Sequence, residues 1–326
     1  MRDARSSPLE SSMTGTAYVT DEVSGDGWRM LLGDSCERLA GLDANSVDLS
    51  IYSPPFADLY TYSGSPRDLG NCRDRSEFFE HYAFILAELI RVTRPGRLCA
   101  VHVADLALTK ARHGYIGTYD FPGDVIRAHE TAGWIYNRRW TINKDPQAQA
   151  IRTKAHQLMF VTLKRDSSKT APALADYLLL FRKPGDSQRP VVPDVSNDEW
   201  IEWASPVTHA REDAELATLA TVAAWTDIRE TNTLNERVAR EDADERHVCP
   251  LQLDLIERCI RLWSNPGELV LSPFAGIGSE GYVAIRKGRR FTGCELKRSY
   301  WDTAVTNLRA AEAERDAPLL FGGDAM

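Results

Sequence analysis

The sequence predicts an α/β fold in which a mostly parallel sheet is covered by helices on both faces. Short apolar runs of the kind found in buried strands alternate with longer segments whose apolar residues recur at the helical period. Turn residues separate many of these segments, as in Arg94-Pro95-Gly96 and Asn265-Pro266-Gly267. Repeated strand, helix and strand segments are typical of parallel sheets, because a crossover helix returns the chain to the same edge.

The composition is that of an ordinary globular protein. The 326 residues are 43% hydrophobic and 26% charged, which allows one large domain or two with an ample core. No apolar run approaches the ~18 residues of a membrane span, and the N-terminus lacks the hydrophobic segment of a signal peptide. The six cysteines are scattered without a Cys-x-x-Cys pair. We therefore expect a cytoplasmic protein with no membrane association and no metal site.

The first half of the chain carries regular alternation after a polar start. Residues 1–27 are rich in Ser, Thr, Gly and Asp and are predicted to form a flexible tail. Strands are then predicted at 28–32, 47–51, 98–103 and 134–142, with helices at 36–41, 76–90 and 122–132 between them. Ser76 is the predicted N-cap of the second helix, Pro122 lies in the first turn of the third, and Gly133 ends it.

Regularity ends near Asp145, and the charge of the chain then changes sign. Residues 138–190 hold eleven Lys or Arg against four Asp, and residues 194–245 hold fourteen acids against four arginines. The basic stretch predicts a polyanion-binding surface, with a solvated face as the alternative. Its central side chains are Arg152, Lys154, Lys164, Arg165 and Lys169. A strand at 176–183 is expected to return the chain to the core, and the acidic stretch, with a helix at 212–224, is expected to be a solvated excursion.

A glycine-rich loop follows a strand in the last third of the chain. A helix is predicted to begin at Pro250, a strand at 268–271 enters Ser272-Pro273-Phe274-Ala275-Gly276-Ile277-Gly278, and a helix at 280–287 precedes a strand ending at Glu295. Gly276 and Gly278 allow a ligand to approach the backbone, and Glu295 can accept hydrogen bonds from both hydroxyls of a ribose. These features predict a nucleotide-type site. A last helix is expected at 299–315.

The same glycines also match a different class of site. Gly276-x-Gly278-x-x-Gly281 formally fits the dinucleotide fingerprint of a nicotinamide enzyme. However, Ser272-Pro273-Phe274 is not a dinucleotide feature, and the chain lacks an evident set of hydride-transfer residues. A nicotinamide-dependent oxidoreductase therefore stays as a remote alternative.

A second motif, Tyr52-Ser53-Pro54-Pro55-Phe56, follows the strand at 47–51. The two prolines fix their own φ and disfavour helix in the residue before each of them, so the chain leaves the strand extended. Prolines donate no backbone hydrogen bond, so carbonyl acceptors are expected beside a hydroxyl and an aromatic face. Such a turn suits a flat group with an amino substituent. A purely structural Pro-Pro turn is the alternative.

Together the two motifs resemble those of the amino-methylating DNA methyltransferases, which use S-adenosylmethionine. The Ser-Pro-Pro-Phe motif precedes the Ser-Pro-Phe-x-Gly-x-Gly motif, as in the circularly permuted beta group, and the resemblance covers most of residues 28–310. Residues 60–181 are similar to phage and prophage members. The resemblance implies a Rossmann-like, permuted class I methyltransferase fold. Residues 28–143 would be the catalytic half, 144–245 a target-recognition insertion, 246–315 the cofactor-binding half, and 316–326 a tail.

The resemblance also implies roles for individual residues. The catalytic residues would be Ser53, Pro54, Pro55 and Phe56. The cofactor would be bound by Asp34, Pro250, Leu251, Ser272, Pro273, Phe274, Gly276, Gly278 and Glu295, with Asp34 near the adenine and Glu295 on the ribose. The five central basic residues would contact DNA.

The implied activity is methyl transfer from S-adenosylmethionine to the exocyclic amine of a flipped base in double-stranded DNA. Ser at the first motif position favours cytosine N4, and adenine N6 is the alternative. A methyltransferase of RNA or of a protein amide, or a catalytically silent DNA-binding relative, is also considered. The resemblance further leaves open a homodimer and a cognate restriction endonuclease, in a bacterial or phage-encoded setting. The target sequence would depend on the geometry of the insertion.

Overall fold

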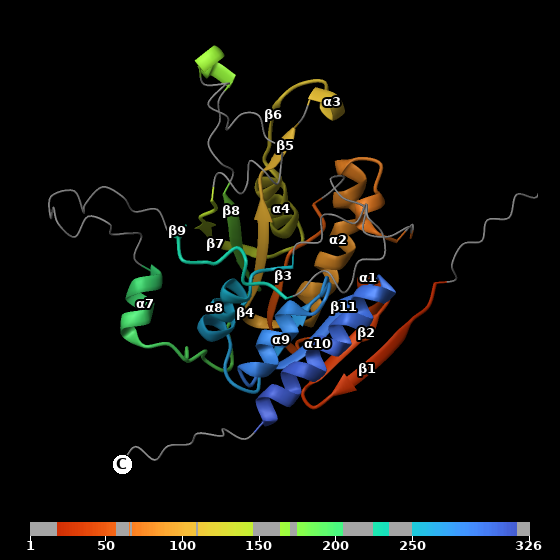
Figure 1. The fold of residues 1–326 in the computed structure, drawn as a ribbon. Helices are drawn as coiled ribbons and strands as arrows, with labels where there is room; N and C mark the ends of the chain where they lie inside the picture. The colour runs from red at the N-terminus through yellow and green to blue at the C-terminus, as the bar shows by residue number, and fades with distance from the viewer. Residues whose placement is uncertain are drawn as a thin grey trace, which may run out of the picture.

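A single large sheet organises the molecule. The computed structural model describes residues 18–56, 65, 67–108, 110–145, 164–169, 175–204, 224–234 and 250–317. Within these residues, nine strands pair in the order β1-β2-β11-β10-β3-β4-β8-β7-β9, and helices cover both faces (Figure 1). The predicted fold class, a mostly parallel sheet between helices, is therefore confirmed.

Five neighbouring strands at the centre of the sheet run parallel. They are β2 (Trp28–Leu32), β11 (Arg290–Glu295), β10 (Leu269–Ser272), β3 (Val47–Tyr52) and β4 (Thr93–Ala104). All six residues of β3 are buried, including the polar Asp48 and Ser50, which alternate with apolar neighbours. Because these strands are parallel, their carboxyl ends meet at one edge of the sheet.

Antiparallel strands complete both sides. On one side β8 (Asp176–Arg182) pairs with β4, β7 (Ile135–Ile142) pairs with β8, and the short β9 (Ala224–Trp225) runs parallel to β7. The predicted returning strand is thus confirmed as β8. A separate hairpin joins β5 (Leu106–Leu108) and β6 (Gly117–Tyr119), neither of which the sequence predicted.

The N-terminal edge corrects one prediction. Residues 21–25, assigned to the flexible tail, form β1 (Asp21–Gly25), which pairs antiparallel with β2. Of its five residues only Val23 packs against the core, so the strand depends on backbone pairing and has no apolar pattern. Residues 1–17 lie outside the described residues.

Six helices form two layers, each with its own apolar core. Residues of α1 (Ser35–Ala40), α2 (Arg75–Val92) and α4 (Phe121–Thr131) pack in one core, and those of α8 (Leu253–Trp263), α9 (Ser279–Arg286) and α10 (Arg298–Asp316) in the other. The other described helical segments are α3 (Lys110–His113), α7 (Asn197–Ala204) and two 3-10 turns, Leu69–Asn71 and Ser167–Lys169.

The structure corrects two predicted helix starts. Asp74, not Ser76, caps α2, because its Oδ1 accepts a hydrogen bond from the Glu77 backbone N–H at 3.0 Å. The helix predicted to begin at Pro250 begins at Leu253, after Gln252. Among the described helices, none is both long and apolar enough to cross a bilayer.

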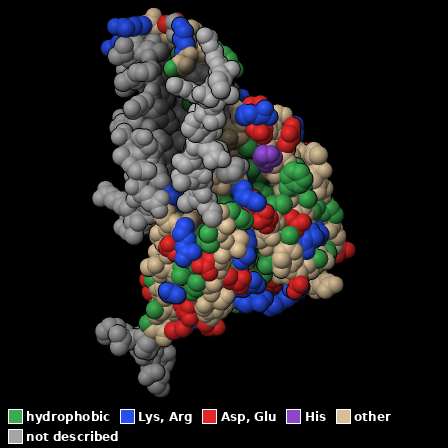
Figure 2. Space-filling model, turned by 90° about the vertical axis from the view of Figure 1, so that its right-hand side faces the viewer, with side chains coloured by type: hydrophobic (Ala, Val, Ile, Leu, Met, Phe, Trp, Pro, Cys, Tyr) green, Lys and Arg blue, Asp and Glu red, His purple; other side chains and the backbone are tan. Residues whose placement is uncertain are grey.

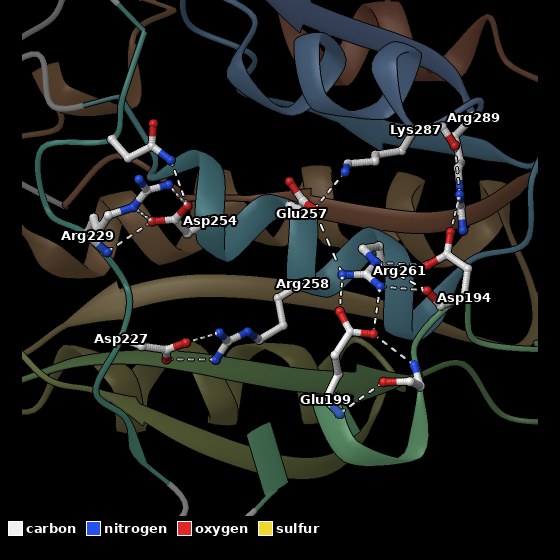
Figure 3. A network of polar contacts seen from close by, with 12 residues as sticks. Asp194, Glu199, Asp227, Arg229, Asp254, Glu257, Arg258, Arg261, Lys287 and Arg289 are labelled. Carbon is white, nitrogen blue, oxygen red and sulfur yellow. Dashed lines mark hydrogen bonds and ion pairs between the residues drawn. The ribbon is translucent and has the colours of Figure 1, made fainter. Parts of the chain in front are cut away.

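The described parts of the acidic stretch are not a solvated excursion. Asp194 and Glu199 both pair with Arg261 of α8, and Asp227 pairs with Arg258 (Figure 3). Arg258 is buried, and its guanidinium also lies over the ring of Trp203. The acids therefore fix this segment against α8. The helix predicted at 212–224 lies outside the described residues, except that residue 224 belongs to β9.

Candidate active site

The two sequence motifs emerge from neighbouring strands. The parallel pairing of β3 with β10 sets Leu271 beside Ser50, so Ser53 and Pro273 follow adjacent strand ends. The rings of Tyr52 and Phe274 lie 5.7 Å apart between centroids, which joins the two loops through an aromatic contact. Motifs more than two hundred residues apart in the sequence are thus brought together at the carboxyl edge of the sheet.

Two glycines of the Ser272–Gly278 motif are required for different local reasons. Gly276 and Gly278 adopt positive φ values of 52° and 85°, which favour glycine. A Cβ on Gly278 would lie 3.1 Å from the Cβ of Ala304, so α10 packs closely against this point. A Cβ on Gly276 would have no atom within 4 Å, so the space beside its backbone is open. Gly276 is therefore the glycine at which a ligand can approach the loop.

Glu295 stands beside that opening. Its Oε2 accepts a hydrogen bond from the Gly276 N–H at 2.9 Å, and its Oε1 accepts one from the Lys297 N–H at 2.8 Å. Burial raises the pKa of Glu295 to about 7, although these two N–H groups act to lower it. Each carboxylate oxygen keeps a further lone pair, so Glu295 can still accept hydrogen bonds from a ligand.

Asp68 is a buried residue that the sequence did not single out, and its charge affects the pKa of Glu295. Asp68, which follows the catalytic motif, contributes to the raised pKa of Glu295 through its negative charge. Its Oδ1 accepts the N–H of Gly70 and so begins the 3-10 turn. No motif surrounds Asp68, and only the fold brings it near Glu295.

Asp34 lies next to Glu295 at the end of the adjacent strand. The Gly33 N–H donates to the backbone oxygen of Glu295 at 2.9 Å. The predicted capping role of Asp34 is confirmed, because its Oδ1 accepts the Cys36 N–H at 2.9 Å. Its other carboxylate oxygen lies 3.5 Å from Arg67, a residue of the loop after the catalytic motif.

Ser53 contacts a chain of polar side chains that reaches into the sheet. Its hydroxyl donates to the His102 backbone oxygen at 3.1 Å, and Oγ also lies 3.4 Å from His102 Nδ1. His102 Nε2 lies 2.9 Å from Asp176 Oδ2, which also pairs with Lys144 Nζ at 2.5 Å. The sequence did not predict these three residues, because each stands alone in its own segment.

The other residues of the Ser53-Pro54-Pro55-Phe56 motif have fixed surroundings. Pro54 is buried, whereas Pro55 and Phe56 are half-buried. The Phe56 ring contacts Phe121 nearly edge-on, with centroids 5.9 Å apart. This contact holds the ring at the start of α4, directly after the two prolines.

The other predicted cofactor residues differ in burial. Ser272 and Pro273 are buried, and the Pro273 backbone oxygen accepts a hydrogen bond from the Ser35 hydroxyl of α1. Leu251 belongs to the core beneath α8, and Pro250 is half-buried. The cofactor roles assigned to these residues stay predictions.

The predicted DNA-binding residues are only partly described. Lys164 and Arg165 are exposed. Arg152 and Lys154, and the side chain of Lys169, lie outside the described residues. On the face drawn in Figure 2, the described acidic and basic side chains are interspersed, so neither sign dominates there.

Comparison with known proteins identifies a family. The model of a family of DNA methylases matches residues 47–306, a range that contains both motifs. Type II methyltransferase M1.MboII of Moraxella bovis is 42% identical over 69 residues, which cover 21% of this chain and 26% of that protein. DNA adenine methyltransferase YhdJ of Escherichia coli K12 is 40% identical over 70 residues, which cover 22% and 24%. The matched segments therefore span about a quarter of each relative.

Solved structures agree in fold over most of the chain. The cytosine-N4-specific PvuII DNA methyltransferase is 18% identical with a TM-score of 0.57, over 90% of this chain and 88% of that one. TTHA0409 of Thermus thermophilus, solved with S-adenosyl-L-methionine, is 23% identical with a TM-score of 0.56, over 86% and 94%. With the family model spanning both motifs and this shared fold, the chain belongs to the DNA methylase family.

Proposed function

We propose that this protein transfers a methyl group from S-adenosylmethionine to an exocyclic amine of a base in duplex DNA. The observation that carries the proposal is the adjacency of the Ser53 turn and the Gly276 loop, in a chain that belongs to the DNA methylase family. Because that family's model spans both motifs, a nicotinamide-dependent oxidoreductase is no longer a competitor.

The residues around Gly276 suit this cofactor. The space beside the Gly276 backbone is open, and Glu295 keeps acceptor capacity for ribose hydroxyls. Asp34, at the end of the adjacent strand, would lie beside the adenine of the cofactor. When bound, the cofactor supplies an electrophilic methyl group on a sulfonium. The chain itself would hold the ribose and methionine ends, so that this methyl faces the Ser53 turn.

The Ser53 turn suits an amino group on a flat ring. The Ser53 hydroxyl donates to the His102 backbone oxygen, which leaves its lone pairs for the hydrogens of the amine. Acceptors aimed at those hydrogens favour a pyramidal nitrogen with an available lone pair. Flipping the base out of the duplex costs a few kcal/mol. Stacking on Phe56 would return ~1–3 kcal/mol.

Duplex DNA would approach from the carboxyl edge of the sheet. Strand β7 runs parallel to β4 and ends at this edge, and β8 begins there, so the segment between them leaves and re-enters beside the Ser53 turn. All five basic residues that the sequence predicted to bind DNA belong to this segment. A homodimer and a partner endonuclease, which the resemblance allows, stay predictions.

For the target base we prefer cytosine N4 over adenine N6. The preference rests on Ser53 at the first motif position, because a hydroxyl tolerates the acceptor pattern of cytosine. The PvuII methyltransferase is named for cytosine N4 and YhdJ for adenine, so the names of these proteins do not choose between the two.

Labelled S-adenosylmethionine and unmethylated DNA test the proposal. After digestion to nucleosides, mass spectrometry should find N4-methylcytosine. The S53A variant should lose about 100-fold or more of the methyl-transfer rate while its cofactor affinity, measured by calorimetry, stays the same. N6-methyladenine alone would overturn the choice of base. Label in RNA or protein but not in DNA, or no label at all, would overturn the function.

A further inference from the structure

The hydrogen-bonded side chains behind Ser53 have a role in the reaction as well as in the stability of the sheet. Resting on the proposed methyl transfer, we propose that His102, held by Asp176 and Lys144, orients the Ser53 hydroxyl and receives through it the proton that the target amine loses. His102 is a positioning residue in this account, because it acts on the substrate only through Ser53.

The pairing of two strands in the sheet places His102 and Asp176 behind Ser53. His102 lies in β4, and Asp176 is the first residue of the antiparallel β8. The pairing sets Leu178 opposite His102 and Asp176 opposite Ala104. Asp176 is therefore the diagonal neighbour of His102 on the same face of the sheet, within reach of a long side chain. Only 7% of His102 and 1% of Asp176 are exposed, so this contact is shielded from water.

The contact with Asp176 selects the tautomer of the imidazole. Burial acts to raise the pKa of Asp176, but its contacts with His102 and Lys144 outweigh burial and lower it. An ionised carboxylate only accepts hydrogen bonds, so a neutral imidazole at this position carries its hydrogen on Nε2. Nδ1 is then a lone-pair acceptor, 3.4 Å from Ser53 Oγ.

Two acceptors of one residue therefore hold the Ser53 hydroxyl hydrogen inward. They are the His102 backbone oxygen at 3.1 Å and Nδ1. The lone pairs of Oγ are left for the amine. An isolated serine hydroxyl would rotate freely and would present its hydrogen to the amine for part of the time.

The proton balance of the reaction matches this arrangement. A nitrogen–carbon bond forms as the carbon–sulfur bond breaks, so the sulfonium loses its positive charge and the amine must lose one proton. That proton passes to Ser53 Oγ while the hydroxyl hydrogen moves to His102 Nδ1. The imidazolium that results is paired with Asp176, and the net charge around the site is unchanged until the proton leaves to water. No further reactant is required.

A matched pair of histidine variants tests the role. H102Q can keep a hydrogen bond to Asp176 through its amide but has no group that accepts a proton beside Ser53. Its single-turnover methyl-transfer rate should fall about 100-fold, while its cofactor and DNA dissociation constants stay within about twofold of the parent. The same substitution at His81, which is exposed on α2, should change none of these values. An H102Q rate within about threefold of the parent overturns the inference.

A second measurement needs no cofactor and no reaction. Long-range ¹H–¹⁵N spectra of the histidine-labelled parent should show neutral His102 with its hydrogen on Nε2, and D176N should weaken this preference. A hydrogen on Nδ1 in the parent overturns the inference, even if H102Q does not fold. If the parent itself transfers no methyl group to DNA, the proposed function fails. That failure is distinguishable, because the spectra still report the state of the chain.

Discussion

At the scale of single residues, two buried acidic groups have raised pKa values near the Gly276 loop. Glu295 has a pKa raised to about 7, and Glu280, fully buried at the start of α9, has one raised to about 8. Burial is the main cause for both, and the negative charge of Glu295 adds to the shift at Glu280. The part of the chain around α9 and β11 therefore holds carboxyls that titrate near neutral pH.

Cofactor affinity should consequently depend on pH through Glu295. Ribose hydroxyls donate to the ionised carboxylate, so affinity should rise several-fold as pH increases from about 6 to about 8, through the pKa of about 7. E295Q should bind the cofactor more weakly and with little dependence on pH. Calorimetric titrations of the parent, E295Q and E280Q measure this, and E280Q should keep the rise. A parent affinity that falls with pH would contradict the role of Glu295.

The same pKa has a consequence for stability without ligand. A carboxyl whose folded pKa is raised above the unfolded value of about 4.3 binds its proton more tightly in the folded state. Its contribution to stability is therefore present at low pH and is lost as pH rises toward about 7. Hydrogen bonds from ligand hydroxyls would offset the free-energy cost of burying the ionised carboxylate.

At the scale of elements, the amino ends of β3 and β10 are joined by buried ions. Arg97 pairs with both Asp48 and Glu268, and the three side chains are nearly fully buried. Asp48 Oδ2 also accepts the Leu269 N–H at 2.9 Å. These contacts fix β3 and β10 relative to each other. The opposite ends of the same two strands carry the two motifs.

E268Q should therefore destabilise the protein by about 3 kcal/mol, because it leaves the Arg97 charge buried with one partner fewer. Burial alone would raise the pKa of Glu268, but hydrogen bonds from Asn265 and Arg97 hold it below its usual value. The difference between parent and E268Q should accordingly shrink as pH falls through that pKa. Urea unfolding measures it, with the more exposed Glu314 as the control: E314Q should cost less than about 0.5 kcal/mol. Equal stabilities of parent and E268Q near neutral pH would refute this account.

At the scale of the whole molecule, the two motifs and the two charged segments belong to different strands of the sheet. The motifs follow β3 and β10, whereas the basic segment lies between β7 and β8 and the acidic segment follows β8. The acidic segment is fixed by ion pairs with α8, as seen in Figure 3, and its described end packs near the cofactor loop, where Leu234 contacts Ile277 and Tyr300.

DNA binding should depend on salt through the basic segment. Removing one phosphate-binding side chain should lower the slope of log affinity against log salt by about 0.9. A K164A/R165A double variant should remove up to two such side chains from the interface without a change in cofactor affinity. Fluorescence anisotropy over a range of salt concentrations measures the slope. R309A, which removes an exposed charge on α10, should leave it unchanged, and equal slopes for all three proteins would argue against DNA binding by Lys164 and Arg165.

The sequence predicted the central strands because each is buried on both faces and is bounded by glycine or proline. It missed β1 and the β5–β6 hairpin, since these depend on backbone pairing rather than on an apolar pattern. The two motifs could be recognised in the sequence because their glycines and prolines each meet a local requirement of the backbone. The contacts of Ser53 with His102, and of His102 with Asp176, could not be predicted. They depend on the antiparallel pairing of β8 with β4, which are far apart in the sequence.

The position of β2 beside β11 also sets an order of assembly during synthesis. Trp28 donates to Glu312 across 284 residues, and among the described strands the one parallel neighbour of β2 is β11. A ribosome would release β2 and the whole Ser53 half long before β11 exists. Such non-local pairing slows folding and leaves a strand edge exposed meanwhile. The place proposed for the methyl donor would therefore be completed only after β11 has been synthesised, long after the Ser53 half.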